Sequence, residues 1–439
     1  MEVKRKLLAG GVAVAALSMV LAGCSGSGTS GDDGDGGEKA TITYWASNQG
    51  TSLDNDKEVL TPVLEKFTEQ TGIGVDLEVI GWNELQTRIQ TAITSGQGPD
   101  VVNIGNTWGA AFQSTGAFAT LDGENGDAIG GLDRFVETAL DAGGAPGESP
   151  TSVPLYGLAY GLYYNKALFA DAGLEPPTTW EELVDVAQTL THDDQWGLTL
   201  AAGSYTENIH FAFLTSAQNG GEFYDADGNP TFDTPENVAG IQRYLDLMQV
   251  SQVADPANAQ YDNASSSAAD LASGKAAMFL SQNNADSTLK ADGMAEGDWG
   301  VVPLPAPSDA VEQISTFPAG INISVFDYTT HLDESLEFVK YMTSPEVQDE
   351  LAVPFSVLPV LSGAEAKFTT DPEEAKVFMD AYQNRSKPLP QVASEGDFES
   401  TIGKGISGLF ARIATGDTVT ADDISAMLDT AQQQVEAAS

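Results

Sequence analysis

The chain has 439 residues and is strongly acidic, with 64 Asp and Glu against 19 Lys and Arg and a formal net charge of −45. This charge excludes nucleic acid as a partner, because nucleic-acid binding requires clustered Lys and Arg that displace counterions. The hydrophobic content of 41% is typical of a globular protein, and the length suffices for two or three domains. The single cysteine excludes an internal disulfide.

The first 39 residues predict a secreted lipoprotein. Basic residues precede an apolar stretch at 7–21, which is too short for an ordinary membrane-spanning helix. The letters LAGC then match the site at which a bacterial lipoprotein signal is cut before an acylated cysteine. We therefore predict a signal peptide at 1–23, lipidation of Cys24 by a fatty acid such as palmitate, and a flexible tether at 24–39. Such an anchor holds the protein at the extracellular face of the cell membrane; the alternative is an ordinary secretory signal with a chance cysteine.

From residue 41 the sequence alternates between strand and helix patterns. Short apolar or alternating segments predict strands at 42–46, 75–79 and 100–104. Apolar residues at helical spacing predict helices at 56–70, from a cap at Asn83 to Gly96, and at 107–115. This βαβαβα order predicts a parallel sheet with helices on its faces.

The carboxyl ends of these three strands predict a ligand site, because ligands of open α/β sheets bind beyond those ends. The ends carry uncharged hydrogen-bonding side chains and indoles: Ser47, Asn48, Gln49, Trp82, Asn106, Thr107 and Trp108. A phosphate site would instead show a basic residue or a glycine-rich loop. Amides that bond hydroxyls and indoles that cover the apolar face of a sugar suit a neutral polyhydroxyl ligand. Trp45, inside the first strand, fits core packing and ligand contact equally well.

The rest of the chain predicts a second α/β unit followed by helices. A Gly- and Pro-rich loop at 141–151 precedes an aromatic extended run at 153–166, whose two glycines indicate a bend between domains. Helices are predicted at 166–172, 180–190 and 206–218, and strands at 196–200, 276–280, 300–304 and as a pair around 317–326. The C-terminal part predicts helices at 333–343, 345–352, 372–384, 398–414 and 421–437.

Several short segments occur in a fixed order over nearly the whole chain after the leader. They are SGQGPDVV at 95–102, YYNK at 163–166, PTTWEEL at 177–183, GKAAM at 274–278 and SPE at 344–346. As an ordered set they resemble the extracellular solute-binding proteins of ABC importers, in the sugar-binding group that includes maltose-binding protein.

The resemblance implies a two-lobed α/β fold, in which each lobe is a mostly parallel sheet flanked by helices and the C-terminus is rich in helices. It assigns residues 40–157 and 283–326 to one lobe and residues 158–282 and 327–439 to the other, with a hinge between them. The lobes would close on a ligand and deliver it to a membrane permease.

The resemblance also implies ligand contacts, and in the first lobe these coincide with the strand-end residues. It adds candidates near the hinge and in the second lobe: Tyr156, Tyr160, Tyr205, Asn283, Asn284, Gly320 and Phe355. Maltose-type members place acidic and basic side chains in the first loop. Here that loop has the uncharged residues Ser47, Asn48 and Gln49, which argues against maltose itself.

Motifs for a cofactor, a metal ion or catalysis are weak in this chain. The glycine pattern at 403–408 does not follow an apolar strand, as a dinucleotide site requires. The segment 225–236 is similar to a calcium loop, but Pro230 stands where that loop requires glycine, so a β-hairpin is predicted instead. The three histidines lack metalloprotease spacing, and there is no GxSxG elbow. The sequence therefore predicts no cofactor, no bound metal and no enzyme activity.

Three other functions are weighed against sugar capture. A glycoside hydrolase needs two carboxylates facing each other across the sugar, and the strand-end loops supply no Asp or Glu. A surface adhesin would show a broad exposed apolar patch. A solute-binding protein for a polyamine, a peptide or a metal ion is the nearest alternative. The prediction is a monomer that binds a neutral mono- or oligosaccharide, with an ABC permease as partner and a lipid anchor in the membrane.

Overall fold

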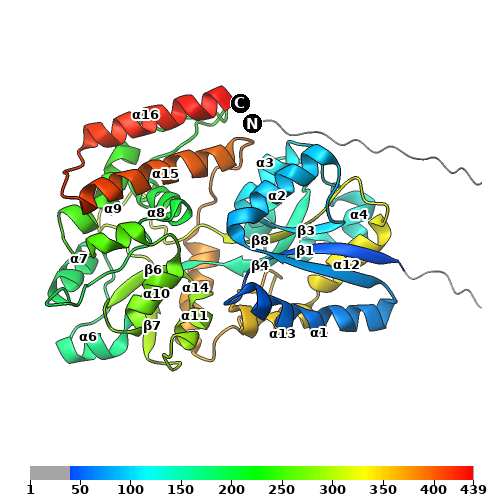
Figure 1. Ribbon diagram of the computed structural model, residues 1–439, viewed down its shortest axis with the longest axis horizontal. Helices are drawn as coiled ribbons and strands as arrows, with labels where there is room; N and C mark the ends of the chain where they lie inside the picture. The colour runs from blue at the N-terminus through cyan, green and yellow to red at the C-terminus, as the bar shows by residue number, and fades with distance from the viewer. Residues whose placement is uncertain (1–39, 439) are drawn as a thin grey trace, which may run out of the picture. The chain divides into compact units, whose positions relative to one another are not determined.

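Two β-sheets, each with its own helices, make up the part of the chain that the structure describes (Figure 1). This computed structural model describes residues 40–438, so the predicted signal peptide, Cys24 and tether lie outside it. We call each sheet with its helices a lobe. Between residues 40 and 438, none of the helices combines the length and the apolar character needed to span a bilayer.

The first lobe is built on a five-stranded mixed sheet. In spatial order its strands are β2 (Gly74–Ile80), β1 (Thr41–Ser47), β3 (Val101–Gly105), β8 (Ala319–Val325) and β4 (Ser152–Leu158). β1 runs parallel to β2 and β3, whereas β8 is antiparallel to both β3 and β4. The first three predicted strands are confirmed, and the region around 317–326 forms one strand rather than a pair.

Helices cover both faces of the first sheet. On one face, Phe338 of α12 (Leu332–Met342) meets Tyr44 of β1 and Phe67 of α1 (Leu53–Thr71) edge-on, with ring centroids 4.9 and 5.2 Å apart. The other face is covered by α2 (Trp82–Ser95), which begins after Gly81 rather than at the predicted Asn83 cap. The lobe is completed by α3 (Gly109–Gln113), α4 (Gly123–Ala128), α5 (Glu137–Leu140) and α13 (Pro345–Phe355).

The second lobe is built on the antiparallel sheet β6 (Met278–Gln282), β5 (Tyr160–Asn165), β7 (Trp299–Val302). The segment predicted as a strand at 196–200 joins it only through isolated parallel bridges, such as Thr199 with Phe279. The sheets are therefore mixed or antiparallel, not mostly parallel as predicted. In the first sheet, β4 runs out toward the second lobe and β8 runs back from it, so these two strands are antiparallel. In the second sheet, β5 runs away from the crossing and β6 runs back toward it, so they are antiparallel as well.

Helices surround the second sheet, and many of them lie in the C-terminal part of the chain (Figure 1). They are α6 (Lys166–Ala172), α7 (Trp180–Thr189), α8 (Tyr205–Gln218), α9 (Pro235–Gln249), α10 (Ala264–Ala272), α11 (Ala285–Ala291), α14 (Pro372–Asn384), α15 (Glu395–Ala414) and α16 (Ala421–Ala438). α8 is buried from Asn208 to Gln218 because α9 and α15 pack on it. The predicted C-terminal helices are confirmed, whereas α9 and α11 were not predicted.

The boundary between the lobes differs from the predicted one at two places. β7 pairs with β5, so residues 283–302 belong to the second lobe and not to the first. α12 contacts β8 and α13 contacts α1, so both helices belong to the first lobe. Strand and helix periodicity does not reveal which sheet an element joins, and the predicted division failed for that reason.

Three chain segments cross between the lobes, and one buried side chain joins two of them. Asn283 accepts a hydrogen bond from the Ala159 amide through Oδ1 (2.8 Å) and donates to the Ser356 carbonyl through Nδ2 (2.5 Å). The third crossing, at 316–318, is tied in because Thr316 Oγ1 accepts a hydrogen bond from the Tyr160 amide (2.9 Å). Asn283 is fully buried and therefore holds the crossing together, contrary to its predicted role in ligand contact.

Candidate functional site

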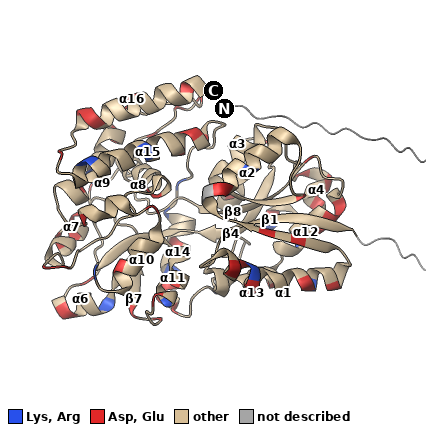
Figure 2. Ribbon diagram, in the orientation of Figure 1, with Lys and Arg blue, Asp and Glu red and all other residues tan. Residues whose placement is uncertain are grey.

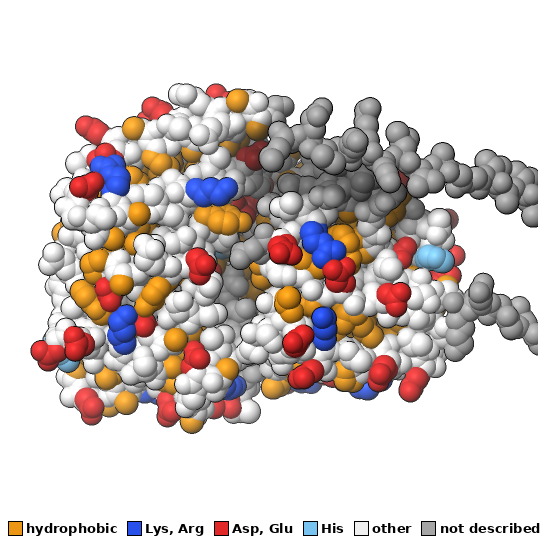
Figure 3. Space-filling view, in the orientation of Figure 1, with side chains coloured by type: hydrophobic (Ala, Val, Ile, Leu, Met, Phe, Trp, Pro, Cys, Tyr) orange, Lys and Arg blue, Asp and Glu red, His pale blue; other side chains and the backbone are white. Residues whose placement is uncertain are grey.

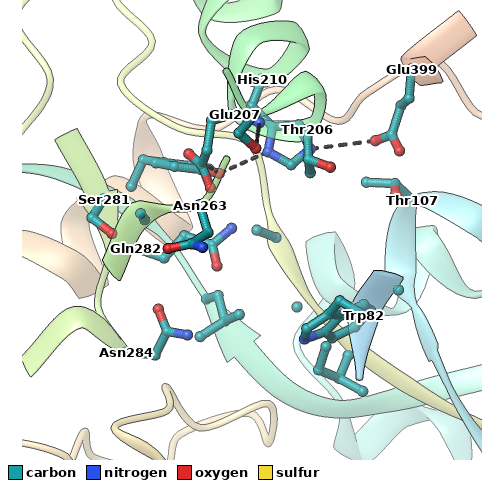
Figure 4. Close-up of a pocket in the computed structure, with 18 of the residues that line it drawn as sticks. Trp82, Thr107, Thr206, Glu207, His210, Asn263, Ser281, Gln282, Asn284 and Glu399 are labelled. Carbon is teal, nitrogen blue, oxygen red and sulfur yellow. Dashed lines mark hydrogen bonds and ion pairs between the residues drawn. The ribbon is translucent and has the colours of Figure 1, made fainter. Parts of the chain in front are cut away.

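A cavity of about 500 Å³ lies between the two lobes. Both lobes contribute to its lining, and Figure 4 shows Trp82 and Thr107 of the first lobe opposite Asn263, Ser281, Gln282 and Asn284 of the second. The predicted site residues that line it are Gln49, Trp82, Asn106, Thr107, Trp108, Tyr160, Tyr205, Asn284 and Gly320. The cavity is thus found where the strand-end argument predicted a ligand site.

The loop after β1 is held in place by a buried carboxylate. Asp56, in the first turn of α1, accepts hydrogen bonds from the Gln49 amide (3.2 Å), the Gly50 amide (2.7 Å) and the side chain of Asn48. Burial raises the pKa of Asp56, and these three hydrogen bonds oppose the rise. The loop is fixed so that the Gln49 side chain, 5% exposed, lines the cavity. Its Nε2 has no hydrogen-bond partner among residues 40–438.

Two predicted residues of this loop do not reach the cavity. Ser47 is buried, and its hydroxyl accepts a hydrogen bond from the Asn103 side chain (3.3 Å). Asn48 turns its amide toward Asp56 and the Gly50 carbonyl. Both side chains make hydrogen bonds within the first lobe, and neither lines the cavity, contrary to the prediction.

Trp82 presents an indole to the cavity at the start of α2. It is 37% exposed, and its Nε1 donates a hydrogen bond to the Asn48 carbonyl (2.7 Å), which fixes the ring. Trp108 meets it at a centroid distance of 5.6 Å and an interplanar angle of 68°, and is itself mostly buried. Trp82 is therefore a braced aromatic platform, whereas Trp108 mainly supports it.

Asn106 and Gly320 place the backbone of two strands beside the cavity. The Asn106 side chain donates a hydrogen bond to the Pro318 carbonyl (2.5 Å), which ties the end of β3 to a crossing segment. Gly320 has φ 153°, and a Cβ there would lie 2.2 Å from the Tyr156 carbonyl oxygen. Only glycine fits this position, because the left-handed φ and the close approach both exclude a side chain.

The second-lobe side of the cavity contains a cluster of ionisable side chains that the sequence did not predict. The Tyr160 hydroxyl lies 2.7 Å from His210 Nδ1 and donates to Glu207 Oε2 at 3.2 Å. His210 Nε2 lies 3.4 Å from Glu399 Oε1 (Figure 4). Glu207 and His210 share a face at the start of α8 because they are three residues apart. Glu399 comes from α15, so no local pattern could have joined it to them.

The pKa values of the two cavity glutamates move in opposite directions. Burial raises the pKa of Glu207, although the charge of His210 and the Tyr160 hydroxyl oppose the rise. Burial also acts to raise the pKa of Glu399, but His210, Glu395 and the Thr107 hydroxyl outweigh it, so the pKa is lowered. Thr107 belongs to the first lobe, so its contact with Glu399 spans the cavity.

Uncharged hydrogen-bonding residues complete the second-lobe side. Asn284 was predicted and lines the cavity. The residues that sequence reasoning missed are Ser204, Thr206, Asn263, Ser265, Ser281 and Gln282. Ser281 and Gln282 stand at the end of β6, where the strand-end argument could have found them had it been applied to the second sheet.

Two predicted aromatic residues belong to the core. Tyr156 and Phe355 meet edge-on with ring centroids 5.6 Å apart and are 2% and 1% exposed. Neither lines the cavity. They differ from the prediction because both rings pack in the core of the first lobe.

The weak motifs have structural explanations. The segment at 225–236 forms the predicted hairpin turn, in which Tyr224 pairs with Pro230 and the Asp225 carboxylate accepts from the Asn229 amide (2.8 Å). The glycine pattern at 403–408 lies inside α15, as the helix prediction requires. Among residues 40–438, no three His, Cys, Asp or Glu side chains are grouped so that they could hold a metal ion.

Charge is spread over both lobes. Figure 2 shows acidic residues scattered along the helices and loops of each lobe. On the face shown in Figure 3, the basic side chains lie singly among acidic and apolar ones. On this face there is no basic patch of the kind that nucleic acid requires, in agreement with the composition.

Comparison with known proteins finds relatives over most of the chain. The model of the family described as bacterial extracellular solute-binding protein matches residues 27–349. The diacetylchitobiose binding protein DasA of Streptomyces coelicolor is 28% identical over 368 residues, which cover 81% of this chain and 82% of DasA. The probable amino-acid ABC transporter periplasmic-binding protein y4oP of Sinorhizobium fredii is 26% identical over 356 residues, which cover 77% of this chain and 76% of that protein.

A solved structure shows the same fold. The GacH receptor of Streptomyces glaucescens, determined unliganded and in complex with acarbose, matches with a TM-score of 0.75 and 24% identity. The match covers 90% of this chain and 98% of that chain. It confirms the predicted two-lobed α/β fold.

Proposed function

The chain belongs to the family of bacterial extracellular solute-binding proteins, and from this premise we propose that it captures a mono- or oligosaccharide between its lobes for an ABC permease. It is a solute-binding protein and not an enzyme, as the sequence predicts. The names of relatives support a sugar: DasA is named for diacetylchitobiose, and the GacH receptor was solved with acarbose.

One observation carries the saccharide proposal. The exposed face of Trp82 lies at a cavity of about 500 Å³ whose lining also carries several side-chain amides and hydroxyls. An indole covers the apolar face of a pyranose, and amides bond the hydroxyls at its rim. The volume lies within the range of roughly 300–1,000 Å³ that small-molecule sites occupy. The neutral saccharide that the sequence predicts suits this first-lobe side.

Thermal unfolding in the presence of a saccharide panel tests the proposal. A sugar at about 100 times its Kd adds roughly 2.7 kcal/mol to the free energy of unfolding, because it binds only the folded state. We expect at least one saccharide to raise Tm. A response to amino acids, peptides, polyamines or metal ions, with none to any saccharide, would contradict the assignment.

A matched pair of tryptophan variants tests the location. Trp82→Ala removes the platform and is expected to weaken saccharide binding about tenfold or more, by calorimetry. Trp45→Ala is the control, because Trp45 lies beneath the Arg88 guanidinium (4.3 Å from the ring centroid) and does not line the cavity. Equal affinity in both variants would place the site elsewhere.

The proposal includes the anchor and the permease. A lipid on Cys24, joined by the tether at 24–39, would keep the captured sugar near a transporter in the same membrane. Cys24→Ser is expected to release the protein from the membrane fraction into the medium. Retention of that variant at the membrane would contradict lipidation at this residue.

A further inference from the structure

The two sides of the cavity differ in charge. Glu207, Glu399 and Asp262 line the second-lobe side, and none of the described residues that line the cavity is Lys or Arg. The first-lobe side, with Gln49, Trp82 and Thr107 among its residues, carries no charged side chain. Lys404 is near the rim, 5.6 Å from the centroid of the Tyr205 ring, but it does not line the cavity.

The carboxylates of this side are only partly satisfied by the protein. Glu207 makes its side-chain hydrogen bond with described residues through Oε2, to the Tyr160 hydroxyl. A cationic ligand group in the cavity would give Glu207 a further hydrogen-bond donor and would stabilise its ionised form.

His210 does not supply that charge in full. It stands between Glu207 and Glu399, and it shares its two ring nitrogens between Tyr160 and Glu399. The lowered pKa of Glu399 keeps this carboxylate ionised at neutral pH. The lining holds three carboxyl groups, on Glu207, Asp262 and Glu399, and one imidazole, on His210, so acidic side chains outnumber basic ones.

A second, independent feature at the first-lobe side supports a ligand in this cavity. Gln49 is 5% exposed and lines the cavity from the other lobe, yet its Nε2 donor has no partner in the described range. A buried amide donor without an acceptor costs free energy unless a ligand supplies one. A ligand hydroxyl or ring oxygen near Gln49 and a cationic group near Glu207 together satisfy both sides.

We propose that the saccharide is an amino sugar, with a neutral ring over Trp82 and a protonated amine held by Glu207 and Glu399. This inference rests on the proposed function and names the class of sugar that the site takes. An ammonium donates charge-assisted hydrogen bonds to carboxylates, which are about twice as strong as neutral ones. An anionic sugar, such as a uronic acid or a sugar phosphate, would be repelled from the same side.

The test compares sugars that differ only in one group. The pairs are glucosamine with glucose, galactosamine with galactose, mannosamine with mannose, and fully deacetylated chitobiose with cellobiose, measured by calorimetry at pH 6.5. In at least one pair we expect the amine to bind ten or more times more tightly than the hydroxyl sugar. Equal or weaker binding of the amine in every pair that binds overturns the inference and leaves saccharide capture intact. Absence of binding by all saccharides, including the neutral panel, overturns both.

Two variants assign the preference to the carboxylates. Glu207→Gln keeps the shape and the Tyr160 contact but removes the charge, so the amine-to-hydroxyl affinity ratio should fall about tenfold. Asp397→Asn is the control, because it removes one negative charge from α15 at an exposed position outside the cavity. A ratio that stays unchanged in Glu207→Gln, or that falls equally in Asp397→Asn, contradicts a direct contact. Circular dichroism melting confirms that both variants are folded.

Discussion

The two lobes build their shares of one cavity in different ways. The first lobe uses the ends of β1 and β3 and the start of α2, and hydrogen bonds near in sequence fix part of this surface, as Asp56 fixes the loop of Gln49. The second lobe adds to its β6 end the starts of two helices, α8 and α15, and brings Glu207 and Glu399 together from opposite ends of its sequence. The first lobe therefore presents an uncharged surface to the cavity. The second gives a charged surface that exists only after the lobe has folded.

Two adjacent residues next to the crossing have different roles: Asn283 holds the crossing segments together, and Asn284 lines the cavity. Asn283→Ala removes the buried bonds to the Ala159 amide and the Ser356 carbonyl, so we expect a loss of about 2–4 kcal/mol in the free energy of unfolding. Asn284→Ala alters the cavity lining instead, and it should weaken ligand binding with little change in stability. Urea unfolding and calorimetry on both variants check this. Similar stabilities for the two variants would contradict the structural role of Asn283.

The first-lobe loop depends on Asp56. Asp56→Ala leaves the Gln49 and Gly50 amides without their acceptor, so the free energy of unfolding should fall by about 2 kcal/mol. Ligand affinity should fall as well, because the loop no longer holds Gln49 in place. Urea unfolding and calorimetry measure both effects. Asp54→Ala is the control, because Asp54 lies in the same helical turn but is exposed. An Asp56→Ala protein with unchanged affinity would show that the loop does not position the site.

The buried Glu395 carboxyl of the second lobe should make stability depend on pH. Burial raises the pKa of Glu395 well above its usual range, and the Glu399 carboxylate adds to the rise. The folded protein therefore keeps a proton that the unfolded chain loses above about pH 4.5, so stability declines as pH rises from there toward the raised pKa. Glu395→Gln should flatten this decline and be more stable at pH 7 by about 1 kcal/mol. Unfolding curves from pH 4 to 8 measure it, and parallel profiles for the variant and the wild type would contradict it.

The smallest effect is expected at Tyr156, which the sequence placed in the site and the structure places in the core. Its hydroxyl is buried without a hydrogen-bond partner among residues 40–438. Tyr156→Phe removes that hydroxyl, so stability should stay the same or rise by up to about 1 kcal/mol, and affinity should not change. A loss of saccharide affinity, measured by calorimetry, would show that Tyr156 contributes to ligand binding after all.

What could be predicted follows the same division. Trp82, Thr107 and Gln49 follow from the rule that ligands bind at strand ends, because strand and helix periodicity marks those ends in the sequence. Ser47 and Asn48 satisfy the same rule, yet they do not line the cavity, because Ser47 bonds with Asn103 and Asn48 bonds with Asp56. The residue pattern gives the end of a strand, but not the direction of each side chain.

The second lobe was less predictable because its contacts are remote. Glu207 and Glu399 are joined through His210 only when α8 packs on α15. β7 was assigned to the wrong lobe for a related reason, since periodicity identifies a strand but not its partner. The strand ends of the first sheet supply no Asp or Glu to the cavity, as predicted. Glu207 and Glu399 line it instead from the helices α8 and α15.

Tryptophan fluorescence during titration tests most directly whether a sugar is held between the lobes. Trp82 is 37% exposed, so a sugar ring over its face should remove water and shift the emission to shorter wavelength. We predict a saturable shift with the preferred saccharide in the wild type and in Trp45→Phe, and its loss in Trp82→Phe. A shift that persists in Trp82→Phe, or no saturable change with any saccharide in the wild type, would contradict capture of sugar at this cavity.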